Sequence, residues 1–386
     1  MFGGASLSVA TGCRVTIDKQ GRLSGLHHLV VAASDIDIEG WIEATGAVFL
    51  RGSSSLEVAS GGRIDAPSGD VIMEAKSGSI KGRVTFKDRL CVEAGYLLVD
   101  TVKAPVGAPL NGSGALVLRS AGALSVATTA LVSGPVQLRA AGALKLAEGM
   151  SVDGASDLLV EGANVAIHGS LKATGQVKVQ AAWSLQFAPK ASIRQAKSVS
   201  LMSKGAAQIS GQILDVAQVT INAAGALYMS PGAALQSAGP VSLVSGGDVG
   251  LHALVKTKGK LYLTAQSLSA GKAASIVGAA EVELLIGGTA ETSWAGSLQG
   301  GGDVFFKGAK LHLVESGTVV SNKNVTFMAA DSLQLDGTIS NNGAVFMSAK
   351  QFSVGASADF SGNASCVIAG EQVAGSVPLK GCQHAL

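Results

Sequence analysis

The chain has 386 residues, of which 47% are hydrophobic, 4% are aromatic and 51 are glycine. Its 29 lysine and arginine residues nearly balance 27 aspartate and glutamate residues, and no basic cluster alternates with aromatic residues as on nucleic-acid-binding surfaces. No apolar run approaches the ~18 residues that a membrane span needs. The sequence therefore predicts neither a nucleic-acid partner nor a membrane span.

Strand patterns begin close to the amino-terminus. Leu7 and Val9, and then Val15 and Ile17, are apolar pairs separated by one residue, which is the period of a β-strand. No polar helix or loop of sufficient length precedes them to cover the first strand edge, and an uncovered edge is a template for further pairing. We therefore expect this face to contact another protein surface, either earlier coils of a longer parent chain or a second copy in a fibre.

An acidic row follows at Asp35, Asp37 and Glu39, which strand alternation places on one outward face. Such a row could bind Ca²⁺ or serve a polysaccharide lyase or hydrolase. It is also typical of a solvated face that keeps a sheet soluble. Neighbouring segments offer few further carboxylates to complete six oxygen ligands, so we favour the solvated face.

A repeat of roughly 21 residues dominates the chain, most regularly in its central and carboxy-terminal parts. Coils begin at Leu116, Val136, Leu158, Val177, Val199, Val219, Val241, Leu261, Val282, Val304, Val325 and Val345. A less regular rhythm extends back through Leu97, Val71, Val48, Leu29 and Leu7. This count predicts about seventeen coils.

Apolar spacing within a coil indicates three short strands. One coil carries apolar residues at Val136, Leu138, Leu144, Leu146 and Val152. Outward residues such as Lys145 lie between them, and clusters of small residues with glycine separate the strands. A single coil cannot bury its inward residues alone, so the coils must stack. The sequence predicts an all-β parallel β-solenoid over residues 1–365 and a cap over residues 366–386.

The four cysteines fall into two groups. Cys366 and Cys382 flank the terminal segment that loses the repeat, so a disulfide between them could hold a cap over the last coil. Cys13 and Cys91 are three to four coils apart, beyond the ~7 Å Cα limit for a bridge. We expect Cys13 and Cys91 to be small buried residues or free thiols.

Catalytic motifs are not found in the sequence. His168, His252 and His312 are separated by several coils, and alternation predicts opposite faces for the adjacent His27 and His28. The chain carries no nucleophile elbow, phosphate-binding glycine loop or zinc-spaced cysteine and histidine set. The sequence predicts no enzyme and no cofactor.

Coils of about twenty residues with small-residue turns and paired Val and Leu strands resemble the β-helical repeats of filamentous-haemagglutinin-like adhesins, the exoproteins of two-partner secretion. The resemblance is best over residues 110–365. That family carries an Asn-Pro-Asn motif in its secretion domain, whereas this sequence contains no Asn-Pro, which puts the secretion route in doubt. The resemblance implies a right-handed β-helix, located outside the cell or on its surface, that holds or forms a binding surface for a cell-surface or carbohydrate ligand.

The leading interpretation is a structural or adhesive extracellular rod, either an adhesin shaft or a fibre subunit assembled through solenoid stacking. A carbohydrate-active β-helix enzyme is the first alternative. It would need an acidic, aromatic-lined groove, for which Trp41, Trp183 and Trp294 are the available stacking platforms. A phage or viral tail-fibre protein is the second alternative, and it should form a trimer.

Overall fold

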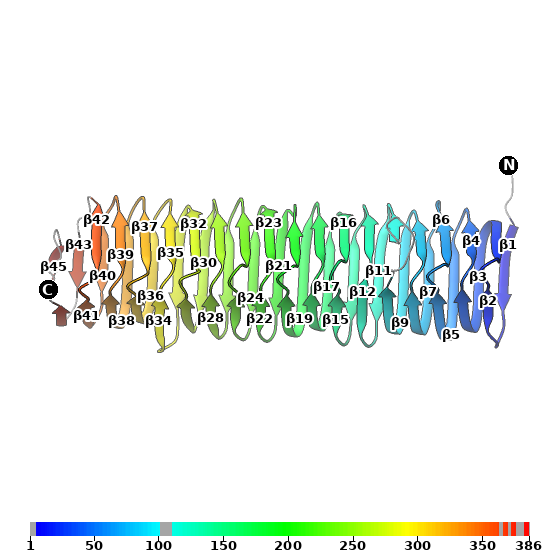
Figure 1. Cartoon of the computed structure of the whole chain (residues 1–386), viewed down its shortest axis with the longest axis horizontal. Coiled ribbons are helices and arrows are strands. Elements are labelled where there is room, and N and C mark those ends of the chain that lie inside the picture. The colour runs from blue at the N-terminus through cyan, green and yellow to red at the C-terminus, as the bar shows by residue number, and fades with distance from the viewer. Residues whose placement is uncertain (1–4, 101–109, 363–365, 370–371, 376–381, 386) are drawn as a thin grey trace. The chain divides into compact units, whose positions relative to one another are not determined.

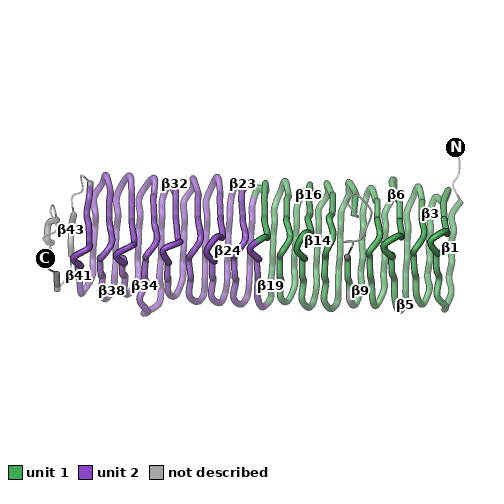
Figure 2. Tube along the Cα trace, viewed as in Figure 1, with its two compact units in different colours: residues 1–182, 190–197 green, residues 183–189, 198–386 purple. Residues whose placement is uncertain are grey.

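The computed structural model describes residues 5–100, 110–362, 366–369, 372–375 and 382–385. The described residues form strands, turns and loops without a helix, so none of them belongs to a helix that could cross a membrane. The chain divides into two compact units (Figure 2). Unit 1 comprises residues 1–182 and 190–197, and unit 2 comprises residues 183–189 and 198–386.

One coil of unit 1 shows how the sequence pattern becomes structure. It consists of β14 (Val136–Ala140), β15 (Leu144–Leu146) and β16 (Ser151–Ala155). Leu144 is buried and Lys145 beside it is exposed, because successive side chains of a strand point to opposite faces. Buried and outward residues alternate along β14 and β15, whereas β16 has two consecutive outward residues, Asp153 and Gly154, at a shift of register. The inward and outward positions predicted for this coil are confirmed.

Coils of unit 1 stack in register through parallel pairing. Val136 lies between Leu116 of β11 (Ala115–Ser120) and Leu158 of β17 (Leu158–Ile167). Leu144 lies between Leu124 of β12 (Leu124–Ala127) and Val165 of β17. Each inward side chain therefore covers the equivalent side chain of the next coil. The repeated strands form parallel ladders (Figure 1), and their inward side chains make an aliphatic core.

Unit 2 repeats this arrangement. The strands β24 (Val219–Ala223), β25 (Leu227–Met229) and β26 (Ala234–Ser237) form one of its coils. They pair in parallel with the next coil, which consists of β27 (Val241–Ser245), β28 (Asp248–Leu251) and β29 (Leu254–Thr257). Both units are therefore parallel β-solenoids, as the sequence predicts.

Buried hydroxyl groups stabilise the corner after the first strand in both units. The Ser120 Oγ atom donates to the Ala123 carbonyl oxygen at 2.8 Å and lies 3.2 Å from the Gly95 carbonyl oxygen of the preceding coil. The Ser245 Oγ atom lies 2.7 Å from the Gly225 carbonyl oxygen in the same way. The hydrogen bonds to Gly95 and Gly225 connect each corner to the equivalent corner of the preceding coil. The sequence analysis did not identify this role, although serine two residues before glycine recurs at the corner.

The coil count and one coil boundary differ from the prediction. The described residues make about sixteen turns, slightly fewer than the seventeen expected. The coil start predicted at Leu97 is wrong, because Leu90 pairs with Leu116 whereas Leu97 pairs with Leu124 of the second strand. Coil length is not constant, since 26 residues separate Glu93 and Arg119 in neighbouring coils.

Parallel pairing continues into the segment for which a cap was predicted. β43 (Cys366–Ala369) pairs with β40 (Val345–Ser348), and β44 (Gln372–Gly375) pairs with β41 (Gln351–Val354). β45 (Cys382–Ala385) pairs with β43. The described strands of this segment thus follow the ladder, and the division at residue 366 stays a prediction.

Candidate functional site

The acidic row lies along the end of β3 (Arg22–Ile38) in unit 1. The Asp35 carboxylate accepts a hydrogen bond from the Ser55 hydroxyl at 2.5 Å and another from the Ser34 hydroxyl at 2.9 Å. These two hydrogen bonds, that of Ser55 first, lower the pKa of Asp35 because they favour its charged form. The oxygen atoms of Asp35 are thus already occupied by hydroxyl donors of its own and the next coil.

No metal centre forms around that row among the residues that the structure describes. Asp37 pairs in register with Glu57 of β5 (Val48–Val58), whose carboxylate accepts a hydrogen bond from Lys81 at 2.6 Å. No group of three or more His, Cys, Asp or Glu side chains in the described ranges is arranged to hold an ion. The calcium candidate Asp35, Asp37 and Glu39 therefore stays a prediction without a supporting contact.

The adjacent histidines do not point to opposite faces as predicted. The ring centroids of His27 and His28 lie 4.2 Å apart. The register of β3 shifts beside them, between Leu23 and Leu26, so the simple alternation of a strand does not hold there. The Nδ1 atom of His28 accepts a hydrogen bond from the Ala47 backbone amide at 3.0 Å. This pair is a corner contact of the coil.

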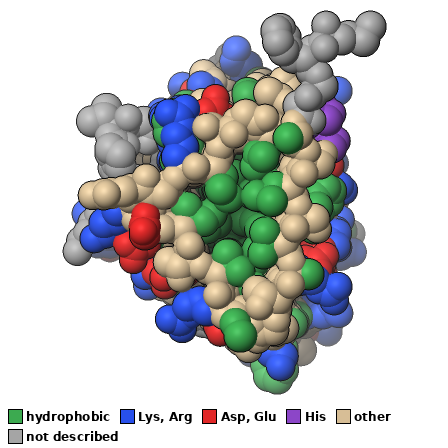
Figure 3. Space-filling model, turned by 90° about the vertical axis from the view of Figure 1, so that its right-hand side faces the viewer, with side chains coloured by type: hydrophobic (Ala, Val, Ile, Leu, Met, Phe, Trp, Pro, Cys, Tyr) green, Lys and Arg blue, Asp and Glu red, His purple; other side chains and the backbone are tan. Residues whose placement is uncertain are grey.

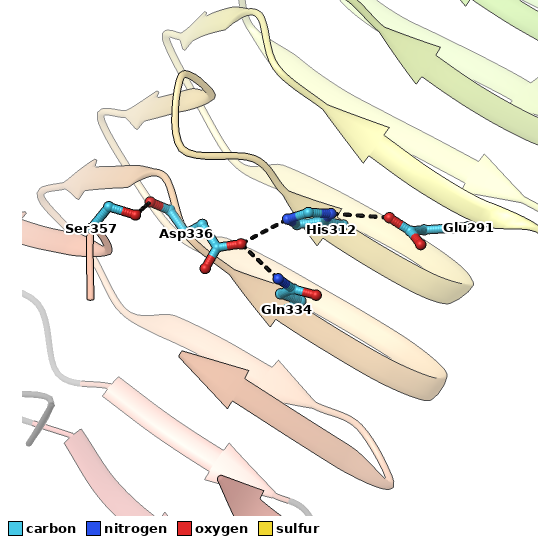
Figure 4. Close-up of polar contacts among 5 residues, drawn as sticks. All are labelled: Glu291, His312, Gln334, Asp336 and Ser357. Atoms are coloured by element: carbon cyan, nitrogen blue, oxygen red, sulfur yellow. Dashed lines mark hydrogen bonds and ion pairs between the residues drawn. The ribbon is translucent and has the colours of Figure 1, made fainter. Parts of the chain in front are cut away.

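His312 in unit 2 forms a polar cluster that the sequence analysis missed (Figure 4). Its Nδ1 atom lies 3.0 Å from Glu291 Oε1, and its Nε2 atom lies 2.8 Å from Asp336 Oδ2. Gln334 donates to the same Asp336 oxygen at 2.7 Å. The histidine is on β36 (Val304–Leu313), Glu291 is on β34 (Glu291–Trp294), and Asp336 follows β38 (Val325–Leu335).

This cluster connects neighbouring coils. The two carboxylates contact opposite nitrogens of the ring, so they do not converge on one position that a metal ion could occupy. Both contacts are satisfied together when the imidazole carries a proton on each nitrogen. The spacing of 21 and 24 residues, each about one coil, is the sequence signal that would have identified the partners.

The amino-terminal face of unit 1 presents apolar side chains (Figure 3). β1 (Ala5–Ala10) pairs with β3, where Leu7 is opposite Leu29 and Val9 is opposite Val31. Leu29 and Val31 are at most 2% exposed, whereas Leu7 and Val9 are only half-buried. Side chains equivalent to core residues therefore lie uncovered by any described coil.

The second strand of that coil contributes the remaining two residues of the predicted face. β2 (Val15–Ile17) pairs with β3, and Val15 and Ile17 are opposite Ile36 and Ile38. Val15 is half-buried and Ile17 is 8% exposed, whereas Ile38 is fully buried. The structure thus brings Leu7, Val9, Val15 and Ile17 to one end of unit 1, and a contact with a further protein surface stays a prediction.

Comparison with known protein families identifies a family with repeats of this kind. The model of the haemagglutinin repeat matches residues 110–172, 173–265 and 228–356, which together cover more than half of the chain. The chain belongs to the haemagglutinin repeat family. No curated protein and no solved structure matches it. The family resemblance predicted from the sequence is confirmed.

The three tryptophans of this haemagglutinin repeat chain differ in how much of each ring is free to bind a sugar. Trp294 is 2% exposed and packs in the core against Phe306, with ring centroids 5.9 Å apart. The ring of Trp41 is covered by the guanidinium groups of Arg22 and Arg63, whose central carbons lie 3.8 and 4.8 Å from its centroid. Trp183 is 70% exposed. Of the three predicted stacking platforms, Trp294 is therefore unavailable to a sugar ring and Trp41 is already occupied.

Two of the four cysteines, Cys13 and Cys91, are free thiols, which is one of the two predicted alternatives. Cys13 is exposed and Cys91 is half-buried, so neither is a fully buried residue. Burial, followed by the charge of Glu93, raises the pKa of Cys91. Cys366 and Cys382 pair in register on adjacent parallel strands, a separation of about 4.8 Å that lies within the Cα range of disulfides. The disulfide itself stays a prediction.

Proposed function

We propose that this haemagglutinin repeat chain is the structural shaft of an adhesin outside the cell or on its surface. The observation that supports the proposal most strongly is the repeated parallel pairing of equivalent core residues, coil after coil, across the range that the family model matches. In such a solenoid each coil contacts only its neighbours, so length can be added without a new core. A shaft is the role that this construction serves best.

Accessibility on intact cells tests the proposed location. Cells that make the protein are treated with a protease that does not cross membranes, and the chain is then detected by antibodies against unit 1 and unit 2. We expect loss of both signals from intact cells, while a cytoplasmic marker protein remains undigested. Protection of the chain on intact cells, with digestion only after lysis, would contradict the proposed location.

We also propose that the amino-terminal face stacks on a coil of another β-solenoid of the same kind. The half-buried Leu7 and Val9 occupy the same inward positions as the fully covered Leu29 and Val31 of the next coil. A further coil would bury them and would pair with the open edge of β1. This contact would extend the shaft along its axis.

Light scattering at increasing protein concentration tests the stacking proposal. Replacement of Leu7 and Val9 by lysine should reduce the concentration-dependent increase in particle mass, because two charges would then enter an apolar contact. Ser8→Lys is the matched control, since Ser8 is exposed and points outward. Equal scattering by the double variant and the unmodified chain would show that this face does not stack.

A further inference from the structure

Six charged residues form a single column on the outer face of unit 1. They occur at the equivalent outward position of six successive coils, and each pairs in register with the next. In order along the stack they are Arg51, Glu74, Glu93, Arg119, Arg139 and Glu161. They lie on β5, β7 (Val71–Ile80), β9 (Arg89–Asp100), β11, β14 and β17. We refer to this set as the charge ladder.

The order of charges in the ladder does not give the fewest repulsive contacts within a single chain. Ion pairs form between Arg51 and Glu74 at 3.5 Å, between Arg119 and Glu93 at 2.9 Å, and between Arg139 and Glu161 at 3.6 Å. However, two acidic residues, Glu74 and Glu93, are direct neighbours, and so are Arg119 and Arg139. Like charges directly opposite each other are unfavourable, and strict alternation would avoid both contacts.

The order becomes favourable when the ladder faces a reversed copy of itself. Read in one direction the charges are plus, minus, minus, plus, plus, minus; read in the other direction every sign is inverted. In an antiparallel pair Arg51 faces Glu161, Glu74 faces Arg139, and Glu93 faces Arg119 of the second chain. We propose that the charge ladder is a self-association surface that binds a second copy of this chain side by side in antiparallel orientation.

A two-fold axis that runs along the strands generates this pair. Such a rotation reverses the order of the coils but keeps each column of side chains opposite itself, so the interface is the same patch on both copies. A two-fold axis along the stack would instead give parallel copies in which equal coils meet, and every charge would face its own kind. The ladder therefore selects the antiparallel dimer over the parallel one.

The column two residues before the ladder is predominantly apolar and follows the same symmetry. It consists of Phe49, Ile72, Cys91, Val117, Gln137 and Leu159, again paired in register from coil to coil. The same reversal places Phe49 against Leu159 and Cys91 against Val117 of the second copy. Phe49 is 40% exposed, so this contact would remove apolar surface from water.

A groove of about 940 Å³ runs beside the ladder and leaves its side chains accessible. All six ladder residues line it, together with small residues of the corner such as Ala75, Ala94 and Ala140. The six side chains are between 43% and 77% exposed. The five steps between the six coils, at about 4.8 Å each, give the ladder a length of roughly 24 Å from first to last residue.

Exchanging charges within the ladder tests the proposal without changing the net charge. Arg139→Glu combined with Glu161→Arg keeps these two residues as an opposite pair within the chain. In the antiparallel dimer, however, it places like charges at four of the six ladder contacts. Adding Arg51→Glu and Glu74→Arg restores opposite charges at all six. In a parallel dimer each residue faces its own equivalent, so neither exchange would matter.

Sedimentation of the full-length variants over a range of concentrations is the measurement. We expect the unmodified chain to form a dimer that weakens as salt rises, because partly exposed charges are screened. The double exchange should raise the dimer dissociation constant at least tenfold, and the fourfold exchange should bring it back to within about threefold of the original value. Circular dichroism checks that every variant keeps its β-structure.

Three outcomes would overturn the proposal. The first is an unmodified chain that stays monomeric at low salt and high concentration. The second is a double exchange that dimerises as tightly as the unmodified chain. The third is a fourfold exchange that stays as weak as the double exchange while both remain folded. A stacking contact through Leu7 and Val9 would respond to the lysine variants above and not to these exchanges.

Discussion

Leu144→Asp is expected to destabilise unit 1 by at least about 3 kcal/mol. Leu144 is 1% exposed and lies between Leu124 and Val165 of the coils on either side. Aspartate at this position would remove the aliphatic contacts with both neighbours and would bury a carboxylate without a partner. The measurement is the shift of the urea unfolding midpoint, followed by circular dichroism.

Lys145→Glu is the matched control for this substitution. Lys145 is the next residue of the same strand, is exposed and points away from the core. Its replacement should change the free energy of unfolding by no more than about 0.5 kcal/mol. If both variants shifted the midpoint equally, the assignment of inward and outward residues would be wrong.

Removal of one whole coil should leave the fold intact, whereas removal of half a coil should destroy it. Deletion of residues 219–240 joins Gln218 to Val241. Gln218 and Pro240 occupy equivalent positions in successive coils. The Gln218 carbonyl oxygen accepts a hydrogen bond from the Val199 amide, and the Pro240 carbonyl oxygen accepts one from the Val219 amide. Val241 would then stack on Val199 in place of Val219, with every inward residue still over an inward residue.

Deletion of residues 219–229 is the matched control, because it removes about half a coil at the same point. Residues of the second corner of the coil would then occupy the positions of its first strand. The inward side chains of one coil would no longer lie over the inward side chains of the next coil. We expect the melting temperature of the whole-coil deletion to stay within about 5 °C of the original, because only one nearest-neighbour contact is replaced. The half-coil deletion should lose cooperative unfolding. Similar melting curves for the two deletions would contradict a register-dependent stack.

The solenoid was predictable because two independent sequence periods, that of two residues along a strand and that of about 21 residues between coils, indicate the same fold. The alternation of Val136, Leu138, Leu144 and Leu146 identifies strands, and the repetition of this pattern after about one coil identifies the stacking partner. Coil boundaries were less predictable where residues are inserted. The 26 residues between Glu93 and Arg119 shifted the expected start to Leu97, and only the observed pairing with Leu90 corrects it.

Surface features depend on register and were harder to predict. The charge ladder is not visible in the sequence, because the separation of its members changes from coil to coil while their outward position does not. The polar cluster of His312 was missed because the histidines were compared with one another. Its partners Glu291 and Asp336 are carboxylates about one coil away on either side. In a solenoid, the interaction partners of a residue are found by comparing it with residues of other types one coil before and one coil after it.

Adhesion by cells that carry the two deletions at residues 219–240 and 219–229 tests the role as a shaft most directly. Surface amounts are first matched by antibody staining, and binding of the cells to their target surface is then counted. The account predicts that the whole-coil deletion adheres as well as the original, because a shaft loses one coil of length and nothing else, and that the half-coil deletion does not adhere. Loss of adhesion by the whole-coil deletion, with the protein folded and present at the surface, would contradict a structural shaft and would place the adhesive function in that coil.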